Sequence, residues 1–344
     1  MPVLRGDDPG AVRAAAGRLA AGELVAFPTE TVYGLGARAD DAQAVARIYA
    51  AKGRPADHPL IVHLAQPDAA PEFATDIGTA AQRLMRAFWP GPLTLILPRR
   101  PDRAAAAAGG QDSIGLRVPA HPVALALLRE AAGLGVPGVA APSANRFGRI
   151  SPTCAAHVQQ EFDADLWVLD GGACGVGIES AIVDCRAAAP ALLRPGQLSR
   201  ARIEAVLGRA LRAADAHSPR APGTLASHYA PRARLRLFDP AALAAGGPPP
   251  WAQLPGAATA SGLAAEPPAR GVAVYSRTEP ERMAGAADSP HWRRMPDEAD
   301  VAAQELFAVL RELDTVGVST IWVECPPADS AWDGVRDRLQ RAAA

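Results

Sequence analysis

The basic side chains that could act on a substrate are almost all arginines. Of the 35 basic residues only Lys52 is a lysine, and it stands two positions before Arg54 in the segment AKGRPADHPLIVHL. A lysine kept in so arginine-rich a chain indicates a need for a compact ammonium group, since the two side chains differ in shape and donor geometry. Two neighbouring cations on a loop stiffened by Pro55 and Pro59 suit a polyphosphate, although paired cations are more often a solvated face.

Five further polar segments lie beside expected strands and offer hydroxyl, amide and guanidinium groups. They are PTETVYGLG (28–36), SIGLRVP (113–119), APSANRFGRISPT (141–153), GIESAIVD (177–184) and LLRPGQ (192–197). Arg117, in a strand among apolar residues, requires an anionic partner, which is either a protein carboxylate or a ligand carboxylate. Ser, Asn and Gly at strand ends are commonly turn residues. Several such segments in one sheet nevertheless favour a shared site beyond the strand ends.

The usual nucleotide, metal and hydrolase motifs are missing from the sequence. Lys52 lacks the upstream glycine of a P-loop. The string from Gly133 to Gly138 has Gly-x-Gly-x-x-Gly spacing, but it follows an expected helix and precedes an expected strand. A dinucleotide fingerprint needs the opposite order, so we interpret this string as a turn. No His-Glu-x-x-His or Gly-x-Ser-x-Gly segment occurs, and the four cysteines form no Cys-x-x-Cys pair, so no protein metal site is predicted.

Composition indicates a folded protein outside the membrane. The chain has 344 residues, of which 49% are hydrophobic and 21% charged, and this excludes wholesale disorder and allows a sizeable core. A formal net charge of -1 argues against a globally basic nucleic-acid binder. No apolar run approaches the ~20 residues of a membrane span, and the N-terminus does not resemble a signal peptide. We therefore expect a reduced, cytoplasmic protein.

Alternating helix and strand patterns over residues 1–211 predict an α/β domain. Because several strand pairs lack room for a helical crossover, we expect a mixed sheet flanked by helices. Strands are expected at 24–27, 60–64, 93–97, 114–118, 138–141, 166–169, 181–185 and 191–194, and helices at 10–21, 42–51, 76–88, 122–132 and 199–211.

A linker and a second, smaller α/β domain are expected after this first domain. Residues 212–232 are irregular and rich in Pro, Gly and Ser, as is typical of a connecting segment. Residues 233–344 are long enough for a small domain of their own. Their patterns predict strands at 234–238, 271–275 and 320–323, and helices at 299–313 and 331–342.

The polar segments together resemble the YrdC-type family. PTETVYGLG, KGRP…PLIVH, LRVP, PSAN…SPT, ES-x-IVD and LRPG occur in the order and spacing of that family over about residues 8–210. The second unit, joined through HYAPR (228–232), is similar to the C-terminal domain of the long, two-domain members. The resemblance implies an open, twisted, mixed sheet flanked by helices, with a basic concave groove.

The resemblance also implies a reaction, that of an L-threonylcarbamoyladenylate synthase. Such enzymes join L-threonine, bicarbonate or CO2, and ATP into threonylcarbamoyl-AMP and release pyrophosphate. A downstream threonylcarbamoyl-transferase machinery then modifies tRNAs that read ANN codons. No enzyme nucleophile is required, so catalysis would consist of positioning and charge stabilisation. Mg2+ is expected with ATP, held mainly by phosphate oxygens and water because the sequence shows no acidic cage.

Residue roles follow from the same resemblance, with Lys52 and Arg54 as the catalytic pair. Arg117 would hold the threonine carboxylate, and Tyr229 would belong to a lid formed by the linker. Threonine or the threonylcarbamoyl group would contact Thr31, His63, Arg117, Ala141 and Ser180. ATP would contact Lys52, Arg54, His58, Ser113, Ser143, Asn145, Ser151, Arg194 and Tyr229.

Several positions depart from the usual pattern of the family. His58 stands where Asn is frequent, and a titratable ring there would make ATP binding sensitive to pH. Phe147 replaces a small polar residue, and Ala181 replaces Thr. The linker segment PGTLASHYAP (222–231) lacks a lysine that many members carry, which would weaken a phosphate contact.

Two rival functions also fit a YrdC-type domain. One is carbamoyl transfer in hydrogenase maturation, but those proteins add an acylphosphatase-like domain and Cys-rich zinc fingers that this sequence does not contain. The other is an RNA-binding module, which the near-neutral net charge disfavours. Bound RNA would show a steep dependence on salt, whereas threonine-dependent release of pyrophosphate would favour the synthase.

Overall fold

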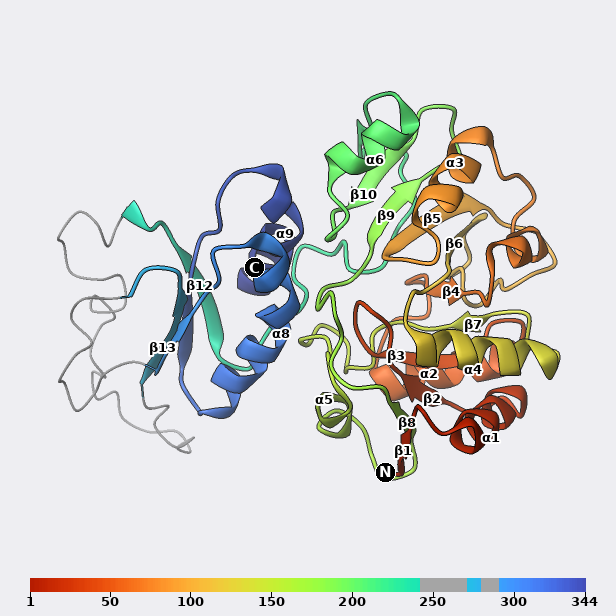
Figure 1. The fold of residues 1–344 in the computed structure, drawn as a ribbon, viewed down its shortest axis with the longest axis horizontal. Coiled ribbons are helices and arrows are strands. Elements are labelled where there is room, and N and C mark those ends of the chain that lie inside the picture. Colours follow the sequence, from red (N-terminus) through yellow and green to blue (C-terminus); the bar gives the residue numbers. More distant parts are fainter. Residues whose placement is uncertain (242–270, 280–290) are drawn as a thin grey trace.

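Two α/β units, each with its own sheet, make up the protein (Figure 1). The computed structural model describes residues 1–241, 271–279 and 291–344. Among these residues, none of the helices combines the length and apolar character that a membrane span needs. The mixed α/β architecture predicted from the sequence is confirmed.

The larger unit is built on one mixed sheet. Its strand order is β1-β8-β2-β3-β7-β4-β6-β5-β9-β10-β11. The pairs β1/β8, β2/β8, β4/β6, β5/β9 and β10/β11 are parallel, and the other neighbours are antiparallel. The strands are β1 (Val3–Arg5), β2 (Val25–Phe27), β3 (Gly34–Arg38), β4 (Ile61–His63), β5 (Leu93–Pro98), β6 (Ser113–Arg117), β7 (Val139–Ala140), β8 (Trp167–Asp170), β9 (Ala181–Asp184), β10 (Ala191–Arg194) and β11 (Arg212–Ala213).

Helices cover the two faces of this sheet unequally. Successive strand residues point to opposite faces, so Ala26 and Phe27 belong to different cores. Phe27 packs with α1 and α4, whereas Ala26 shares a core with residues of α2, α3 and α6. The helices are α1 (Pro9–Ala20), α2 (Ala42–Lys52), α3 (Thr79–Phe88), α4 (Pro122–Gly133), α5 (Ala155–Gln159) and α6 (Arg200–Leu207), with a short 3-10 helix η1 (Pro67–Glu72).

The face that carries α1 and α4 is left partly open further along the sheet. There Ile61, Ile96, Ile182 and Leu193 form a small apolar cluster on β4, β5, β9 and β10. The residue that packs over them is Ala221, which comes from the connection between the two units and not from a helix. This part of the face is therefore available for a ligand site.

Local sequence signals explain how α2 delivers its last residues to that open face. The Asp41 side chain accepts hydrogen bonds from the first backbone N–H groups of α2, and Gly53 ends the helix in the left-handed conformation with φ 63°. The helix therefore stops directly after Lys52, and the chain turns toward Arg54. The predicted helix at 42–51 is confirmed.

Several short elements were not predicted from the sequence. The segment 28–36 was interpreted as a loop, but Gly34–Arg38 forms β3 between β2 and β7. An added Cβ at Gly36 would lie 2.8 Å from Phe27 Cε1 and 2.9 Å from Val139 Cγ1, so this strand needs glycine for close approach. The strands β1, β11 and β14 (His291–Arg294) and the helix α5 were also missed. The string from Gly133 to Gly138 is a helix-to-strand turn, as predicted.

The smaller unit is a four-stranded parallel sheet in the order β12-β15-β13-β14. Its two long helices lie between this sheet and the larger unit (Figure 1). Both helices turn apolar residues toward the small sheet, among them Leu310 and Leu339. The elements are β12 (Arg234–Phe238), β13 (Val272–Ser276), β14 (His291–Arg294), α8 (Ala299–Thr315), β15 (Thr320–Glu324), η3 (Ser330–Trp332) and α9 (Asp333–Ala343).

The two units are joined by buried contacts as well as by the chain. Ile150 and Ile178 of the larger unit belong to the same hydrophobic cluster as the buried residues of α8 and α9. Arg311 of α8 forms a buried ion pair with Glu161, with Nη2 and Oε1 2.8 Å apart. Gly177, with φ 80°, lies so close to α8 that an added Cβ would be 2.3 Å from the Gln304 carbonyl oxygen. The interface is therefore packed like a protein interior.

Replacing Gly177 by Ala is expected to destabilise this interface. The left-handed backbone alone costs an alanine about 1–2 kcal/mol, and the clash with α8 adds about 1–3 kcal/mol of overpacking. Urea-induced unfolding of the full chain measures the sum.

Gly110→Ala is the matched control for this substitution. Gly110 has φ 78°, but nothing lies within 4 Å of an added Cβ. It therefore reports the backbone cost alone. Equal destabilisation by the two variants would contradict tight packing of α8 on Gly177.

Candidate active site

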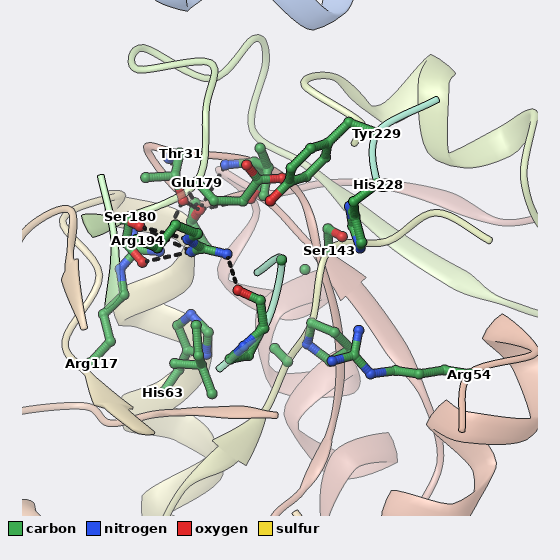
Figure 2. Close-up of a pocket in the computed structure, with 18 residues that line it drawn as sticks. Thr31, Arg54, His63, Arg117, Ser143, Glu179, Ser180, Arg194, His228 and Tyr229 are labelled. Carbon is green, nitrogen blue, oxygen red and sulfur yellow. Dashed lines mark hydrogen bonds between the residues drawn. The ribbon is translucent and has the colours of Figure 1, made fainter. Parts of the chain in front are cut away.

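A cavity, partly open to solvent, lies over the exposed part of the sheet face. Figure 2 shows Arg117 and His63 on one side of it, Arg54 on the other, and Glu179 and Tyr229 along one edge. The expected site residues that line it are Thr31, Arg54, His63, Arg117, Ala141, Ser143, Ser180, Arg194 and Tyr229. Residues from strand ends far apart in the sequence therefore meet at one place.

Arg117, at the end of β6, is held by protein groups on three sides. Its Nη2 lies 2.7 Å from Glu30 Oε1, Nη1 donates to Thr31 Oγ1 at 2.9 Å, and Nε donates to Gly91 O at 3.2 Å. From the sequence, the anionic partner of Arg117 was expected to be either a protein carboxylate or a ligand carboxylate. Glu30 is a protein carboxylate that pairs with it. A guanidinium carries five N–H groups, so two remain after these contacts.

Arg54 and Arg194 are buried guanidinium groups without a carboxylate within 4 Å among the described residues. Arg54 donates to Pro59 O at 3.0 Å, and Arg194 donates to Ser180 O and Pro222 O at 3.1 and 2.7 Å. Burial lowers the pKa of Arg54 to about 10 and also lowers the pKa of Arg194. Both stay charged at neutral pH, so the cavity carries positive charge that an anion would neutralise.

Several buried polar atoms around the cavity have no hydrogen-bond partner among the described residues. Such atoms are rare in proteins and usually indicate a missing ligand or water. Such atoms also occur elsewhere among the described residues, but five of them lie around this one cavity, where a polar ligand would satisfy them. They are Arg54 Nε, His63 Nδ1, Asn145 Oδ1, His228 Nδ1 and Tyr229 Oη.

Lys52 lies behind the cavity wall and is almost fully buried. Its Nζ donates to the Ser143 carbonyl oxygen at 2.7 Å and also to the Asn145 carbonyl oxygen. Burial, together with the nearby Arg54, lowers the pKa of Lys52 well below its usual value. An ammonium group has three donors, so one is left after these two bonds. The lysine therefore supports the 143–145 loop, whatever ligand it contacts.

Ser151 and Asn145 are both buried beside the cavity. The Ser151 hydroxyl donates to a carboxylate oxygen of Glu179. Asn145 uses its Nδ2 group to bind Arg146 O and Arg149 O at 2.7 and 2.9 Å, and so folds the loop back on itself. Both side chains thus have structural partners in addition to their expected contacts with ATP.

A second cavity of about 340 Å3 adjoins the first and shares Arg54 and His228 with it. His58 and Phe147 line this second cavity, and their ring centroids are 5.4 Å apart. The Arg54 guanidinium carbon lies 5.6 Å from the centre of the Phe147 ring. The departures at positions 58 and 147 therefore lie together, in a partly aromatic extension of the main cavity.

Ser113 lies at the other end of β6 from Arg117 and is not among the residues that line either cavity. Because strand residues alternate between faces, Ser113, Gly115 and Arg117 point to the same side of the sheet. Gly115 has no side chain to fill the space over the strand, and an added Cβ would contact Ile96 and Thr94. Ser113 therefore lies on the correct face, four residues along the strand from the cavity.

The linker closes the cavity from above. Tyr229 has φ 66°, a left-handed conformation that is uncommon for a residue with a side chain. Its ring is fully buried against His228, with ring centroids 4.2 Å apart. An added Cβ at Gly223 would lie 2.2 Å from Tyr229 Oη, so the linker folds back tightly on itself.

The site also contains residues that sequence reasoning did not assign to it. Glu179, His228 and Thr29 line the cavity, and Glu30 fixes Arg117 from behind. Glu179, His228 and Glu30 are each adjacent in sequence to an assigned residue, and Thr29 is two positions from Thr31, so proximity in sequence is the signal that could have found them. Arg338 binds Glu179 from the far end of the chain, and nothing in its local sequence marks it.

The sequence and the fold are similar to those of known proteins. Residues 18–196 match the Sua5/YciO/YrdC family model, described as "Telomere recombination", and residues 198–344 match the model described as "Threonylcarbamoyl-AMP synthase, C-terminal domain". The threonylcarbamoyl-AMP synthase of Bacillus subtilis is 45% identical over 240 residues, 68% of each chain. That of Pyrococcus abyssi is 37% identical over 337 residues, 96% of this chain and 93% of the relative.

A solved structure extends the match to the whole described fold. The crystal structure of P. abyssi Sua5 complexed with L-threonine has a TM-score of 0.82 and 34% identity, covering 99% of this chain and 96% of that one. The fold is thus that of a two-domain YrdC-type protein. The chain belongs to the Sua5 family of threonylcarbamoyl-AMP synthases. The resemblance drawn from the sequence segments is confirmed.

Replacing His63 by Gln is expected to reduce the loss of stability in acid. Burial, with Arg117 nearby, lowers the pKa of His63 to about 3, against about 6.5 in an unfolded chain. Between these values the unfolded chain binds more protons, so the free energy of unfolding falls as the pH falls. From pH 7 to pH 5 the share of this ring is about 2 kcal/mol. Urea unfolding at both pH values measures it.

His217→Gln serves as the control because His217 is exposed. An exposed ring has the same watery surroundings in the folded and unfolded states, so this variant should lose as much stability as the wild type between pH 7 and pH 5. If His63→Gln also lost as much as the wild type, a buried neutral ring at position 63 would be wrong.

Proposed function

We propose that this protein makes threonylcarbamoyl-AMP from L-threonine, bicarbonate and ATP, with release of pyrophosphate. The observation that carries the proposal is the cavity with Arg117 and Thr31 on one side, Arg54 on the other, and Arg194 bound to Ser180 beside them (Figure 2). A cavity with two cationic ends suits a small amino acid beside a nucleotide phosphate. Membership of the Sua5 family supports the same reaction.

The threonine side is formed by groups that match an amino acid. Arg117 keeps two N–H groups for the carboxylate, and the Thr31 hydroxyl lies beside it. Ser180, whose hydroxyl is 2.8 Å from that of Thr94, would contact the carbamoyl group. His63 and Ala141 would complete the pocket. The threonine amine takes up CO2 to give a carbamate, and the adjoining walls hold it beside the phosphate.

The nucleotide side is formed by cations and by the second cavity. Arg54 and Arg194 would bind the phosphates, with Lys52 beneath the 143–145 loop, and the ring of Phe147 offers an apolar surface for the base. The carbamate oxygen attacks the α-phosphorus, the bond to the β-phosphate oxygen breaks, and pyrophosphate leaves with the electron pair. The charge that develops on the phosphates is met by preorganised guanidinium groups.

Mg2+ would accompany the triphosphate in this proposal. The two carboxylates nearest the site are committed to arginines, Glu30 to Arg117 and Glu179 to Arg338. Among the described residues no cluster of three or more His, Cys, Asp or Glu side chains has the arrangement of a metal site. The ion would therefore be held mainly by phosphate oxygens and water. Its chemistry would be to neutralise the charge of the leaving pyrophosphate.

The product is a mixed anhydride, and it must be passed to an acceptor before it hydrolyses. We propose that the acceptor is tRNA, through a separate threonylcarbamoyl-transferase machinery, and that the reaction takes place in the cytoplasm. The names of the relatives support the first product only. The transfer step and its partners rest on the family resemblance.

A reconstitution with defined substrates tests the proposal. The full chain is incubated with ATP, bicarbonate, Mg2+ and each amino acid in turn, and the adenylate is identified by its mass. We expect threonylcarbamoyl-AMP and an equal amount of pyrophosphate with threonine. A protein that released no pyrophosphate, or released it without any amino acid, would rule out the synthase.

Replacing Arg117 by Lys is expected to raise the KM for threonine roughly tenfold to hundredfold, because one ammonium cannot bind Glu30, Thr31 and a ligand carboxylate in one plane. The KM for ATP should change much less. Steady-state pyrophosphate release measures both constants.

Arg186→Lys is the matched control for this substitution. Arg186 also pairs with a protein carboxylate, that of Asp184 at 3.0 and 3.1 Å, but it does not line the cavity. Its KM for threonine should equal that of the wild type. An unchanged KM in Arg117→Lys would show that this arginine does not hold the threonine carboxylate.

A further inference from the structure

The smaller unit reaches the candidate active site through Arg338 of α9. The side chain of Arg338 is 0% exposed, although it comes from a different unit than the residues it contacts. Its Nε donates to Glu179 Oε2 at 2.8 Å and its Nη2 donates to Glu179 O at 3.0 Å. Its Nη1 donates to Pro195 O at 2.9 Å. Glu179 lines the cavity and Pro195 follows Arg194, so one guanidinium ties together two segments of the site.

A glycine one turn earlier in α9 allows this approach. Gly334 and Arg338 are four residues apart and share one face of the helix. An added Cβ at Gly334 would lie 2.9 Å from Gly196 O and 2.8 Å from Ile178 Cδ1. The helix therefore lies directly against the loops before β9 and after β10, with no room for a side chain at position 334. This close packing sets the separation between α9 and Glu179 that the Arg338 side chain spans.

The same helix supports the linker above the cavity. The guanidinium carbon of Arg338 lies 5.5 Å from the centre of the Tyr229 ring. The backbone N–H of His228 donates to Arg341 O at 3.0 Å, and the Arg341 guanidinium donates to Leu225 O. The last carbonyl groups of a helix lack partners within it, so the linker satisfies one of them. The residues that close the cavity thus rest on α9.

The contact between Glu179 and Arg338 also determines whether Arg194 is available to an anionic ligand. Glu179 and Arg194 both line the cavity, and the field of Arg194 acts on the Glu179 carboxyl. Yet the carboxylate oxygens of Glu179 are taken by Arg338 and Ser151, and Arg194 has no carboxylate within 4 Å among the described residues. A buried carboxylate that lost Arg338 would turn to the nearest cation. That cation would be Arg194, which would then be lost to an anionic ligand.

We propose that Arg338 is a positioning residue of the active site, which engages Glu179 so that Arg194 remains open to the nucleotide phosphates and which seats Tyr229 over the cavity. The second unit is then part of the site itself. The proposal deepens the proposed function and rests on it for the identity of the nucleotide as ATP.

The test compares three variants of the full chain. Arg338→Met removes the charge, so Glu179 should pair with Arg194, and the KM for ATP should rise about 30-fold or more, the usual effect of breaking a buried charge pair. Adding Glu179→Gln to Arg338→Met removes the competing carboxylate, so the KM for ATP should fall back toward the wild-type value. A merely structural interface would not give this recovery. Pyrophosphate release supplies kcat and KM.

Arg336→Met is the matched control. Arg336 is on the same helix, but its contacts, to the carbonyls of Pro327 and Asp329 and to the Asp333 carboxylate, are all within the smaller unit. It should leave the KM for ATP unchanged. A KM for ATP in Arg338→Met within about twofold of the control would overturn the proposal, and so would a double variant as impaired as the single one.

Two further measurements keep the outcome decisive. If Arg338→Met fails to fold by circular dichroism, Arg338→Lys replaces it. Its single ammonium can hold the Glu179 carboxylate but not Pro195 O as well, so a KM for ATP raised about threefold to tenfold is expected, and a wild-type KM overturns the proposal. Titration calorimetry with ATP alone gives the same ranking of affinities without turnover. If the wild type binds ATP but makes no adenylate, the proposed function fails and the role of Arg338 is still decided.

Discussion

The structure depends on keeping several guanidinium groups buried and charged around one cavity. Taking such ions out of water costs several kcal/mol each unless partners compensate for the loss. The buried arginines of the site differ in how this desolvation cost is compensated. Arg117 and Arg338 have buried carboxylate partners in Glu30 and Glu179, whereas Arg54 and Arg194 are solvated by backbone carbonyls. Among the described residues, Arg54 and Arg194 therefore lack a carboxylate partner, which an incoming anion would supply.

The architecture follows from the need to surround these ions with little water. A sheet face covered wholly by helices would leave no room for a ligand, and a bare face would let water screen the charges. Here α1 and α4 cover one part of the face, and Ala221 of the linker packs over part of the remainder. The second unit supplies Arg338, so it contributes to the charge balance of the site.

Sequence reasoning recovered the elements whose signals are local. The alternation of strands and helices, the cap at Gly53 and the polar segments at strand ends all lie within short windows. β3 was missed because its glycines, which the close approach of Phe27 and Val139 requires, also indicate a loop. Glu179 and Arg338 lie 159 residues apart, and no pattern in either segment indicates that the two side chains pair. What could not be predicted was therefore the pairing of charges, which only the folded chain decides.

The single lysine shows how a compositional signal can have two causes. Its rarity indicated a ligand that needs a compact cation, and the structure gives Lys52 another task, which is to bind two carbonyl oxygens of the 143–145 loop. A lysine makes both bonds from one compact Nζ atom, whereas an arginine spreads its donors over a planar fork. The loop that Lys52 holds presents Ser143 to the cavity and Asn145 beside it. Lys52 thus shapes this side of the cavity through the backbone of the loop.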